Sequence, residues 1–513
     1  MVKTASSGFI ASGCRILLLA LCFVHTLHAA THDVRRYGAT GDGKTMETAA
    51  IQKAIDAAAA AKGGQVVFPA GTYLSGTIRL KSGVNLHLEK GATLLGSSNR
   101  ADYQKLNFLG LILADKQDRV GISGNGVIDG NGRILADGVV GTIKPGKFPD
   151  ANEALRPVII NFRNCTNVTV RDVTLRESAC WVQLYRDCER VLLENVKVRT
   201  MAAITNDGLD IDGCSKVIVR GCDIDSEDDG ICLKSSRRIC EDVLIENCRV
   251  RSSCNAFKLG TASFAGFKNI TCRNLEIHDT YLSGIALECV DGGVLENVNI
   301  SKVRITDTNN PLFIRLGRRV PEAPPGSIRG VTVSDVTAEI PNRRREEMNK
   351  FPPYWRHQCT TLITASITGL PGNPVRGVTL KNISFLYGGI GPAPKKDHHR
   401  IDRLDQVPEC AENYPESKMF GTLPAWGFYC RHVEGLRFEN VTLRAKAADY
   451  RAALVCDDVA NLALTNFRVQ SAGAEPVIVL KDVNGAVIRD SPPPPGARSF
   501  IKTLGKTSRV TGP

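Results

Sequence analysis

The stretch Val168-Thr-Val-Arg-Asp-Val-Thr-Leu175 decides the fold, because its pattern recurs along the chain. Apolar residues alternate with other residues, a turn-forming residue follows, and the alternation resumes. Further copies begin at Val191, Val217, Val243, Ile270, Val298, Val331, Val378, Leu436 and Leu462. The first six starts are 23, 26, 26, 27 and 28 residues apart. A repeat of this length indicates a solenoid, in which each coil packs against its neighbours.

The alternation on both sides of the turn predicts two short strands, each with one buried face. A third apolar pair follows in each copy, such as Leu209 and Ile211. Three strands per coil predict an all-β fold, a right-handed, single-stranded parallel β-helix. A leucine-rich repeat would need a fixed Leu/Asn consensus and a helix in each copy, and the sequence has neither. The turn residues, at the fifth position of each copy, are Asp172, Asn195, Gly221, Asn247, Asn274, Lys302, Asp335, Asn382, Asn440 and Asn466. All except Lys302 are residue types that tolerate a left-handed backbone.

Cysteines mark another inward position, three residues before each copy. Four successive coils hold Cys165, Cys188, Cys214 and Cys240 there, and six other coils hold larger apolar residues. A free cysteine behaves as a small buried hydrophobic residue, so we expect these thiols in the core. Disulfides between stacked coils are an alternative, because strands ~4.8 Å apart suit a bridge. A metal site is the least favoured reading, since ligands must converge on one point.

The two ends of the chain differ from the repeat. Lys3 and Arg15 precede an apolar run and the small residues Ala29 and Ala30, a pattern typical of a secretory signal peptide. We therefore expect residues 1–30 to be removed and the protein to be secreted or periplasmic, with a retained anchor helix as the alternative. Residues 31–513 are predicted to form one β-helix domain. Its parts are an N-terminal cap and first coils (31–130), main coils (158–480) and an extended C-terminal segment (490–513). A helix over residues 46–61 would cover the open N-terminal end.

The composition sets limits on the class of protein. Of 513 residues, 43% are hydrophobic and 23% are charged, which excludes a disordered chain. After the leader no stretch approaches ~18 uninterrupted apolar residues, so stable membrane insertion is not expected. The formal net charge of +12 indicates an acidic partner without identifying it.

Outward-facing carboxylates gather on two successive coils. They are Asp207, Asp210, Asp212, Asp228 and Asp229. Like charges at this density cost stability unless they bind a cation or raise a pKa for acid catalysis. Lys234, Lys258 and Arg315 are expected on the same face, which opposes a calcium site and favours an anionic substrate. Asp-Gly steps are also ordinary turn sequences, so the stacked set carries more weight than any single aspartate.

These residues resemble glycoside hydrolase family 28, the polygalacturonases and their relatives, in a divergent bacterial-type branch. The resemblance lies in Asn206-Asp207-Gly208-Leu209-Asp210 and, one coil later, in Asp228-Asp229-Gly230-Ile231-Cys232-Leu233-Lys234-Ser235. The segments Asp33-Val34, Gly41-Asp42-Gly43 and Gly71-Thr72-Tyr73 are similar to the entry of pectin-acting β-helix enzymes. Matches to this pattern run from about residue 32 to 505, nearly the whole mature chain.

Three motifs depart from the family pattern. The family's Asn-Thr-Asp stands here as Thr205-Asn206-Asp207, and its Gly-His-Gly as Cys254-Asn255-Ala256. Its Arg-Ile-Lys falls on Ala286-Leu287-Glu288, which removes two cations from that coil. Lys258 and Arg315 are expected to substitute for them. A rhamnogalacturonan or another uronate-bearing pectic chain is therefore an alternative to simple homogalacturonan.

The resemblance implies an exported, inverting glycoside hydrolase without metal or cofactor, acting on an acidic pectic polysaccharide or oligosaccharide. Asp228 would be the general acid, while Asp207 and Asp229 activate the attacking water, at the ~6.5–9.5 Å separation that inversion requires. The neighbouring carboxylates should keep Asp228 protonated. The residues expected to bind substrate are Asn255, Lys258, Arg315, Lys234 and Glu288.

The sequence leaves two alternative functions. A calcium-dependent pectate lyase could use the same fold, and so could a non-catalytic carbohydrate-binding or adhesion solenoid. We expect the protein to be a monomer and to bind no nucleic acid.

Overall fold

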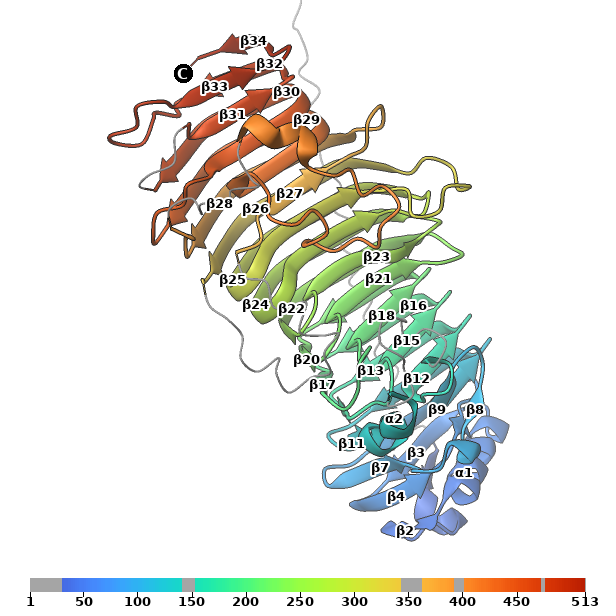
Figure 1. Cartoon of the computed structure of the whole chain (residues 1–513). Helices are drawn as coiled ribbons and strands as arrows, with labels where there is room; N and C mark the ends of the chain where they lie inside the picture. Colours follow the sequence, from blue (N-terminus) through green and yellow to red (C-terminus); the bar gives the residue numbers. More distant parts are fainter. Residues whose placement is uncertain (1–29, 141–152, 343–361, 392–400, 472–475, 513) are drawn as a thin grey trace, which may run out of the picture.

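The computed structural model describes residues 30–140, 153–342, 362–391, 401–471 and 476–512. Strands one coil apart pair in parallel, with Val168, Val191 and Val217 in register at the starts of successive copies. The coils stack into an elongated molecule with the N-terminal coils at one end and the C-terminal coils at the other (Figure 1). The predicted parallel β-helix is therefore confirmed.

Three walls of stacked strands form the solenoid. The first wall contains β1 (Thr31–Asp33), β3 (Gly64–Phe68), β6 (Val84–Leu88), β10 (Asp118–Ser123), β13 (Thr166–Arg171), β16 (Glu189–Glu194), β19 (Ser215–Arg220), β32 (Asn484–Arg489) and β34 (Ser508–Thr511). The second contains β2 (Asp42–Met46), β4 (Gly71–Ser75), β7 (Ala92–Gly96), β11 (Val127–Asp129), β14 (Thr174–Arg176), β17 (Lys197–Thr200) and β20 (Asp223–Ser226).

The third wall carries the residues of functional interest. It contains β5 (Ile78–Arg79), β9 (Leu109–Asp115), β12 (Val158–Arg163), β15 (Gln183–Arg186), β18 (Leu209–Asp212), β21 (Ile231–Ser235), β23 (Phe257–Ser263), β27 (Ala365–Thr368), β31 (Ile478–Lys481) and β33 (Ile501–Leu504), with β8 (Gln104–Lys105) antiparallel to β9. Longer strands bend from one wall into the next. They are β22 (Cys240–Ser252), β24 (Phe267–Cys289), β25 (Val294–Leu316), β26 (Ser327–Ile340), β28 (Val375–Tyr387), β29 (Ala425–Ala445) and β30 (Ala452–Gln470).

The bend between the first and second walls is left-handed in every copy. All ten residues at the fifth repeat position have φ between 52° and 64°, including Lys302. Asparagine side chains continue the stacking here, because the Asn274 amide donates to Asn247 Oδ1 at 2.6 Å and the Asn466 amide to Asn440 Oδ1 at 3.0 Å. The left-handed bend that the sequence predicts at the fifth position is thus confirmed.

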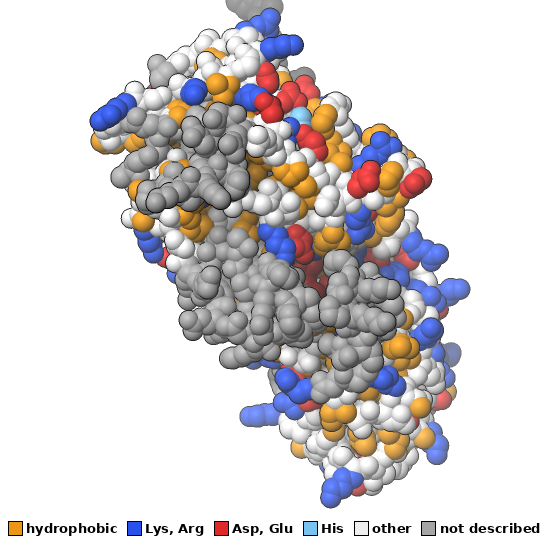
Figure 2. All heavy atoms as spheres, in the orientation of Figure 1, with side chains coloured by type: hydrophobic (Ala, Val, Ile, Leu, Met, Phe, Trp, Pro, Cys, Tyr) orange, Lys and Arg blue, Asp and Glu red, His pale blue; other side chains and the backbone are white. Residues whose placement is uncertain are grey.

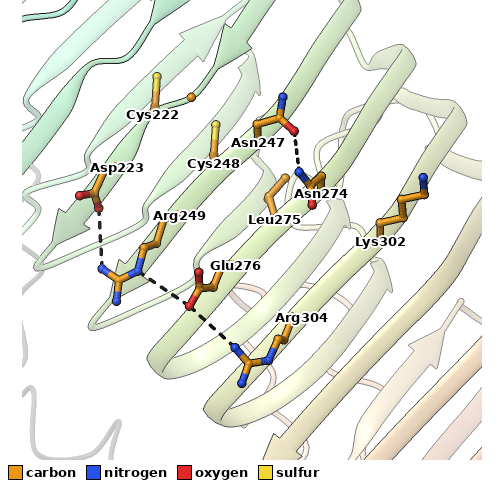
Figure 3. Close-up of a pocket in the computed structure, with 11 residues that line it drawn as sticks. Cys222, Asp223, Asn247, Cys248, Arg249, Asn274, Leu275, Glu276, Lys302 and Arg304 are labelled. Carbon is orange, nitrogen blue, oxygen red and sulfur yellow. Dashed lines mark hydrogen bonds and ion pairs between the residues drawn. The ribbon is translucent and has the colours of Figure 1, made fainter.

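A shallow hollow beside these turns holds a ladder of alternating charges (Figure 3). Arg249 lies 4.0 Å from Asp223 and 3.9 Å from Glu276, and Arg304 lies 3.9 Å from the same Glu276 carboxylate. Exposed pairs at such distances contribute about 0–1 kcal/mol each. Because these charges are paired with one another and lie on the second wall, the hollow is separate from the carboxylates of the third wall.

The cysteine column lies in the core, as predicted. Cys165, Cys188, Cys214 and Cys240 are buried and unbridged. The Cys165 N–H donates to Cys188 Sγ at 3.4 Å, and the Cys188 N–H donates to Cys214 Sγ at 3.3 Å. The sulfurs of Cys188 and Cys214 therefore fill core positions and also satisfy a backbone donor of the preceding coil.

The N-terminal end is covered as the sequence predicted. Helix α1 (Thr48–Ala60) buries Ile51 and Ile55 and lies at the blue end of the molecule in Figure 1. The described residues contain a second α-helix, α2 (Gly132–Val140), and short 3-10 helices η1 (Val34–Tyr37), η2 (Arg100–Asp102) and η5 (Ile401–Gln406). No helix among the described residues is long and apolar enough to cross a membrane. The predicted leader lies outside the described residues, apart from Ala30.

The C-terminal segment differs from its prediction. Residues 490–513 were expected to be extended, but β33 and β34 pair in parallel with β31 and β32 and add a further coil. The four prolines at 492–495 precede this coil rather than replace it.

Cys188 provides a test of the core. We expect Cys188→Asp to lower the free energy of unfolding by about 3 kcal/mol or more, because an unpaired charge would be buried. Cys188→Ala, as the matched control, should cost much less. Denaturant unfolding measures both variants. Equal stabilities for the Asp and Ala variants would show that this position is open to water.

Candidate active site

The three predicted catalytic aspartates meet where the loops before β18 and β21 stack on each other. The Gly208 N–H donates to the Asp229 carbonyl at 2.8 Å, which fixes one loop on the next. One carboxylate oxygen each from Asp207 and Asp229 and the sulfur of Cys232 lie within 4.8 Å of one another. Asp228, Asp229 and Cys254 form a second group of the same size. Figure 2 shows acidic side chains at the bottom of a hollow midway along the molecule, over the green strands of Figure 1.

Asp229 is the carboxylate held in its ionised form. Its Oδ1 accepts hydrogen bonds from the Asn255 side-chain amide at 2.8 Å and the Asn255 N–H at 3.3 Å, and its Oδ2 lies 2.9 Å from Lys258 Nζ. Burial acts to raise the pKa of Asp229, but Lys258, Lys234 and the Asn255 hydrogen bond outweigh it and lower the pKa. Asn255, expected to bind substrate, is itself buried and serves to position Asp229.

Asp228 has the opposite electrostatic environment. Burial, followed by repulsion from Asp207 and Asp229, raises its pKa well above the usual range of an aspartate. Its carbonyl accepts the Ser226 hydroxyl at 2.9 Å and the Ser252 hydroxyl at 2.7 Å, which fixes the backbone. The side chain of Asp228 is only half-buried, whereas Asp207 and Asp229 are each 4% exposed. Asp228 is thus the protonated carboxyl closest to solvent.

Asp207 shares a lysine with a deeper carboxylate. Lys234 Nζ lies 3.4 Å from Asp207 Oδ2 and 2.9 Å from Asp210 Oδ1. Burial raises the pKa of Asp207 in spite of Lys234, and it raises that of Asp210 further. The outward cluster does not include Asp212, whose carboxylate lies 2.8 Å from the Arg186 guanidinium.

Two glutamates border the aspartates. Glu227 is buried, and this burial raises its pKa well above the usual range. Glu288 is fully buried with its Oε2 3.8 Å from Lys258 Nζ. Burial raises the pKa of Glu288 to about 8, although Lys258 opposes that change. The sequence had marked Glu288, but it gave Glu227 no role although this residue directly precedes the two aspartates.

Arg315 does not lie where the sequence placed it. It was expected at the outward position of Lys258, but Lys258 aligns with Ala286 and Phe313, and Arg315 aligns with Glu288. Its guanidinium donates to the carbonyls of Glu409 at 2.6 Å and Cys410 at 3.0 Å. Arg315 therefore anchors a covering segment and does not face the aspartates.

That covering segment, residues 404–423, closes the later coils of the third wall. It buries Leu404, Phe420 and Leu423 against outward apolar side chains of the solenoid. Those side chains are Ala286, Phe313, Ala425, Tyr429, Ala452, Val455 and Val479. The segment extends back to Tyr414, whose ring lies 5.5 Å from Lys258 Nζ. The open part of this wall therefore ends at Tyr414.

Aromatic rings flank the aspartates on both sides. Trp181 precedes Asp207 by one coil, and Lys234 Nζ lies 4.8 Å from the centre of its ring. Phe108 packs against Trp181 with ring centres 5.0 Å apart. Tyr414, on the opposite side, is 43% exposed, and its hydroxyl lies 3.3 Å from Thr261 Oγ1. Neither Trp181 nor Tyr414 belongs to a repeated position, so periodicity gave no signal for them.

Fold and site together define a parallel β-helix enzyme with a carboxylate centre. The profile of glycosyl hydrolases family 28 matches residues 59–342, more than half of the chain. The chain therefore belongs to glycosyl hydrolases family 28, as its motifs predicted.

Individual relatives cover smaller parts. An exo-poly-alpha-D-galacturonosidase of Dickeya chrysanthemi is 29% identical over 248 residues, 39% of this chain and 41% of that protein. A plasmin and fibronectin-binding protein A of Streptococcus pneumoniae is 36% identical over 155 residues, 28% of this chain and 20% of that protein. A hyperthermoactive exopolygalacturonase of Thermotoga maritima shares the fold with a TM-score of 0.58 at 21% identity, over 70% of this chain and 87% of that chain. The match thus spans less than half the length of these two curated relatives.

Lys258 should set the acidic limb of the pH profile. In Lys258→Met the pKa of Asp229 should rise, because its closest cation is gone. A carboxylate that must be ionised would then lose activity at a higher pH. The measurement is kcat/KM against pH, with the exposed Lys268→Met as a control that leaves the profile unchanged. An unmoved acidic limb in Lys258→Met would contradict this role of the lysine.

Proposed function

We propose that the chain hydrolyses glycosidic bonds of a pectic polysaccharide or oligosaccharide with inversion at the anomeric carbon. The observation that carries this proposal is that two adjacent carboxyls have opposite environments. Burial and the neighbouring aspartates raise the pKa of Asp228, whereas Lys258 Nζ, 2.9 Å from Asp229, helps to lower the pKa of Asp229. An inverting glycosidase needs one acid for the leaving oxygen and one base for water. The nearest side-chain oxygens of Asp228 and Asp229 lie within 4.8 Å of each other, closer than the ~6.5–9.5 Å expected for an inverting pair, so inversion rests on the family resemblance and is tested by the anomer first formed.

In the proposed step both carboxyls act on the same glycosidic bond, one on its leaving oxygen and the other on the attacking water. Asp228 donates its proton to the glycosidic oxygen as the bond to the anomeric carbon breaks. Asp229 accepts a proton from a water molecule, whose oxygen bonds to the opposite face of that carbon. Asp207 lies beside Asp229 and orients the water. The product carries a hydroxyl of inverted configuration, and the two aspartates have exchanged protonation states.

Substrate class and location are part of the proposal. Membership of family 28 and similarity to the exo-poly-alpha-D-galacturonosidase of Dickeya chrysanthemi support a galacturonate-containing pectic chain. The leader-like segment at residues 1–30 supports export to the periplasm or the medium, and we propose a monomer there. The lyase alternative would require a free basic side chain, and the two lysines that the described part of the chain places at the aspartates, Lys234 and Lys258, are both ion-paired.

Asp228→Asn tests the assignment of roles. We expect kcat to fall by at least ~10²-fold, the usual scale for general acid catalysis, with the fold retained. Binding should survive, because the amide resembles the protonated carboxyl in shape and charge. Reducing-sugar release on pectic oligosaccharides measures turnover, and proton NMR follows the anomer first formed.

Asp223→Asn is the matched control, since Asp223 lies in the hollow of the second wall. It should leave turnover unchanged. Near-normal turnover in Asp228→Asn, or a product of retained configuration, would overturn the proposed mechanism. Unsaturated products seen by ultraviolet absorbance would indicate a lyase instead.

A further inference from the structure

Two loops stack residue on residue at the carboxylate centre. One joins β20 to β21, and the other joins β22 to β23 one coil later. Ser226 pairs with Ser252 where the loops begin, and Ile231 pairs with Phe257 where they end. The two loops therefore have the same length, and each residue of the first has a counterpart at the same place in the second.

Both aspartates of the first loop have such a counterpart. Asn255 is the counterpart of Asp229, and its side-chain amide donates to Asp229 Oδ1 at 2.8 Å. Cys254 is the counterpart of Asp228, and its sulfur lies within 4.8 Å of a carboxylate oxygen of Asp228. The stacking that supplies Asp229 with an amide donor thus supplies Asp228 with a thiol.

Hydrogen bonds of the main chain hold Cys254 in this place. The Ser252 hydroxyl donates to the Asp228 carbonyl at 2.7 Å and accepts the Cys254 N–H at 2.8 Å. The Cys254 carbonyl accepts the Leu282 N–H of the following coil at 2.9 Å. Cys254 is 4% exposed and unbridged. Its thiol is therefore held beside the carboxyl group of Asp228 and away from solvent.

The Cys254 thiol acts on Asp228 as a hydrogen-bond donor. Burial raises the pKa of Cys254 well above its usual range, so the sulfur keeps its proton in neutral solution. A thiol is a weak donor, and it bonds more strongly to a carboxylate than to a neutral carboxyl group. Burial and two neighbouring aspartates raise the pKa of Asp228, and the thiol and Lys258 act against that rise.

We infer that Cys254 is a positioning residue for the general acid, because its thiol stabilises the Asp228 carboxylate that remains after the proton has been transferred. The inference rests on the proposed function, in which Asp228 is that acid. An acid that holds its proton too strongly is a poor donor, so a hydrogen bond to its ionised form favours the transfer. The family's Gly-His-Gly has glycine where this chain has Cys254, so the contact is not part of the family pattern.

Other charged groups also face Asp228, and substitutions at residue 254 leave them in place. Among the residues that the structure describes, they are Asp207 from the loop before β18, Glu227 and Asp229 from the loop of Asp228 itself, Lys258 from β23 and, beside Cys254, Glu416 from the covering segment. A change in the titration of Asp228 that follows the side chain at residue 254 therefore measures the contribution of that side chain.

Two substitutions of Cys254 should move the titration of Asp228 in opposite directions. Cys254→Ala removes the donor, so the carboxyl should lose its proton at a higher pH than in the native protein. Cys254→Ser provides a stronger donor of nearly the same shape, so the proton should be lost at a lower pH. Carbon-13 NMR of the Asp228 carboxyl measures the titration directly, and the basic limb of kcat against pH should move in the same two directions.

The size of the effect on turnover distinguishes a positioning residue from the acid. Cys254→Ala should lower kcat at its own optimum by less than about tenfold, because a thiol is a weak donor. Asp228→Asn removes the acid itself and should cost at least ~10²-fold. Cys289→Ser is the matched control, since Cys289 is a buried thiol that donates to the Gly293 carbonyl at 3.0 Å. This control should leave the titration of Asp228 unchanged.

Infrared spectroscopy gives a second measurement that needs no substitution at residue 254. The S–H stretching band of a thiol moves to lower frequency as its acceptor becomes stronger. One such band should therefore move down in the native protein as the pH rises through the ionisation of Asp228, and this change should be absent in Asp228→Asn. If Cys254→Ala does not fold, the Ser variant and this thiol band decide.

The outcomes separate the inference from the proposed reaction. A titration of Asp228 that is the same in the Ala and Ser variants, or that moves in one direction in both, would overturn the inference. A thiol band that does not respond to the ionisation of Asp228 would overturn it too. If the native enzyme releases no sugar from pectic oligosaccharides but the titration moves in the two expected directions, the proposed reaction fails and the thiol contact stands. If Asp228→Asn inactivates the enzyme while neither variant of Cys254 moves the titration, the reaction stands and the inference fails.

Discussion

Coil-on-coil register is the constraint on which the rest of the structure depends. A parallel ladder aligns residues of successive coils, so a residue type at one repeat position recurs as a column along the solenoid. The left-handed bend at the fifth position keeps this register in each copy. Columns of buried valine and cysteine then hold the core, and columns of outward residues build the functional wall. Asp207 meets Asp229 because their coils are stacked.

That stacking also produces the electrostatics of the site. Carboxyls that lie one coil apart, with little water between them, cannot all remain ionised. Lys234 on β21 and Lys258 on β23 determine which of these carboxyls stay ionised. Lys258 lies closest to Asp229 and stabilises its anion, whereas burial and the neighbouring aspartates favour the protonated form of Asp228. An acid and a base therefore arise from the same residue type at adjacent positions.

Features that repeat, and the capping helix α1 with its own helical periodicity, could be predicted from the sequence, whereas the irregular segments could not. The turn residues, the cysteine column and the three aspartates follow from offsets within each copy. Arg315 was placed two residues out of register because Leu312, Ile314 and Leu316 are all apolar, and alternation cannot choose between such registers. The segment 404–423 lacks the repeat pattern, so the sequence could not predict that Tyr414 lies near the aspartates. Spacing also placed Lys234 and Lys258 on the wall that carries the aspartates. It could not show that each lysine forms ion pairs with carboxylates of the protein itself.

The most direct test of the account is the protonation of Asp228 itself. Carbon-13 NMR of aspartate-labelled protein, compared with Asp228→Asn, identifies the carboxyl resonance of this residue. We expect this carboxyl to remain protonated well above the pH at which an ordinary aspartate ionises. We also expect Asp229 to be ionised in the same spectrum. A signal of Asp228 that titrates at about pH 4, as in an unperturbed aspartate, would contradict its role as the general acid.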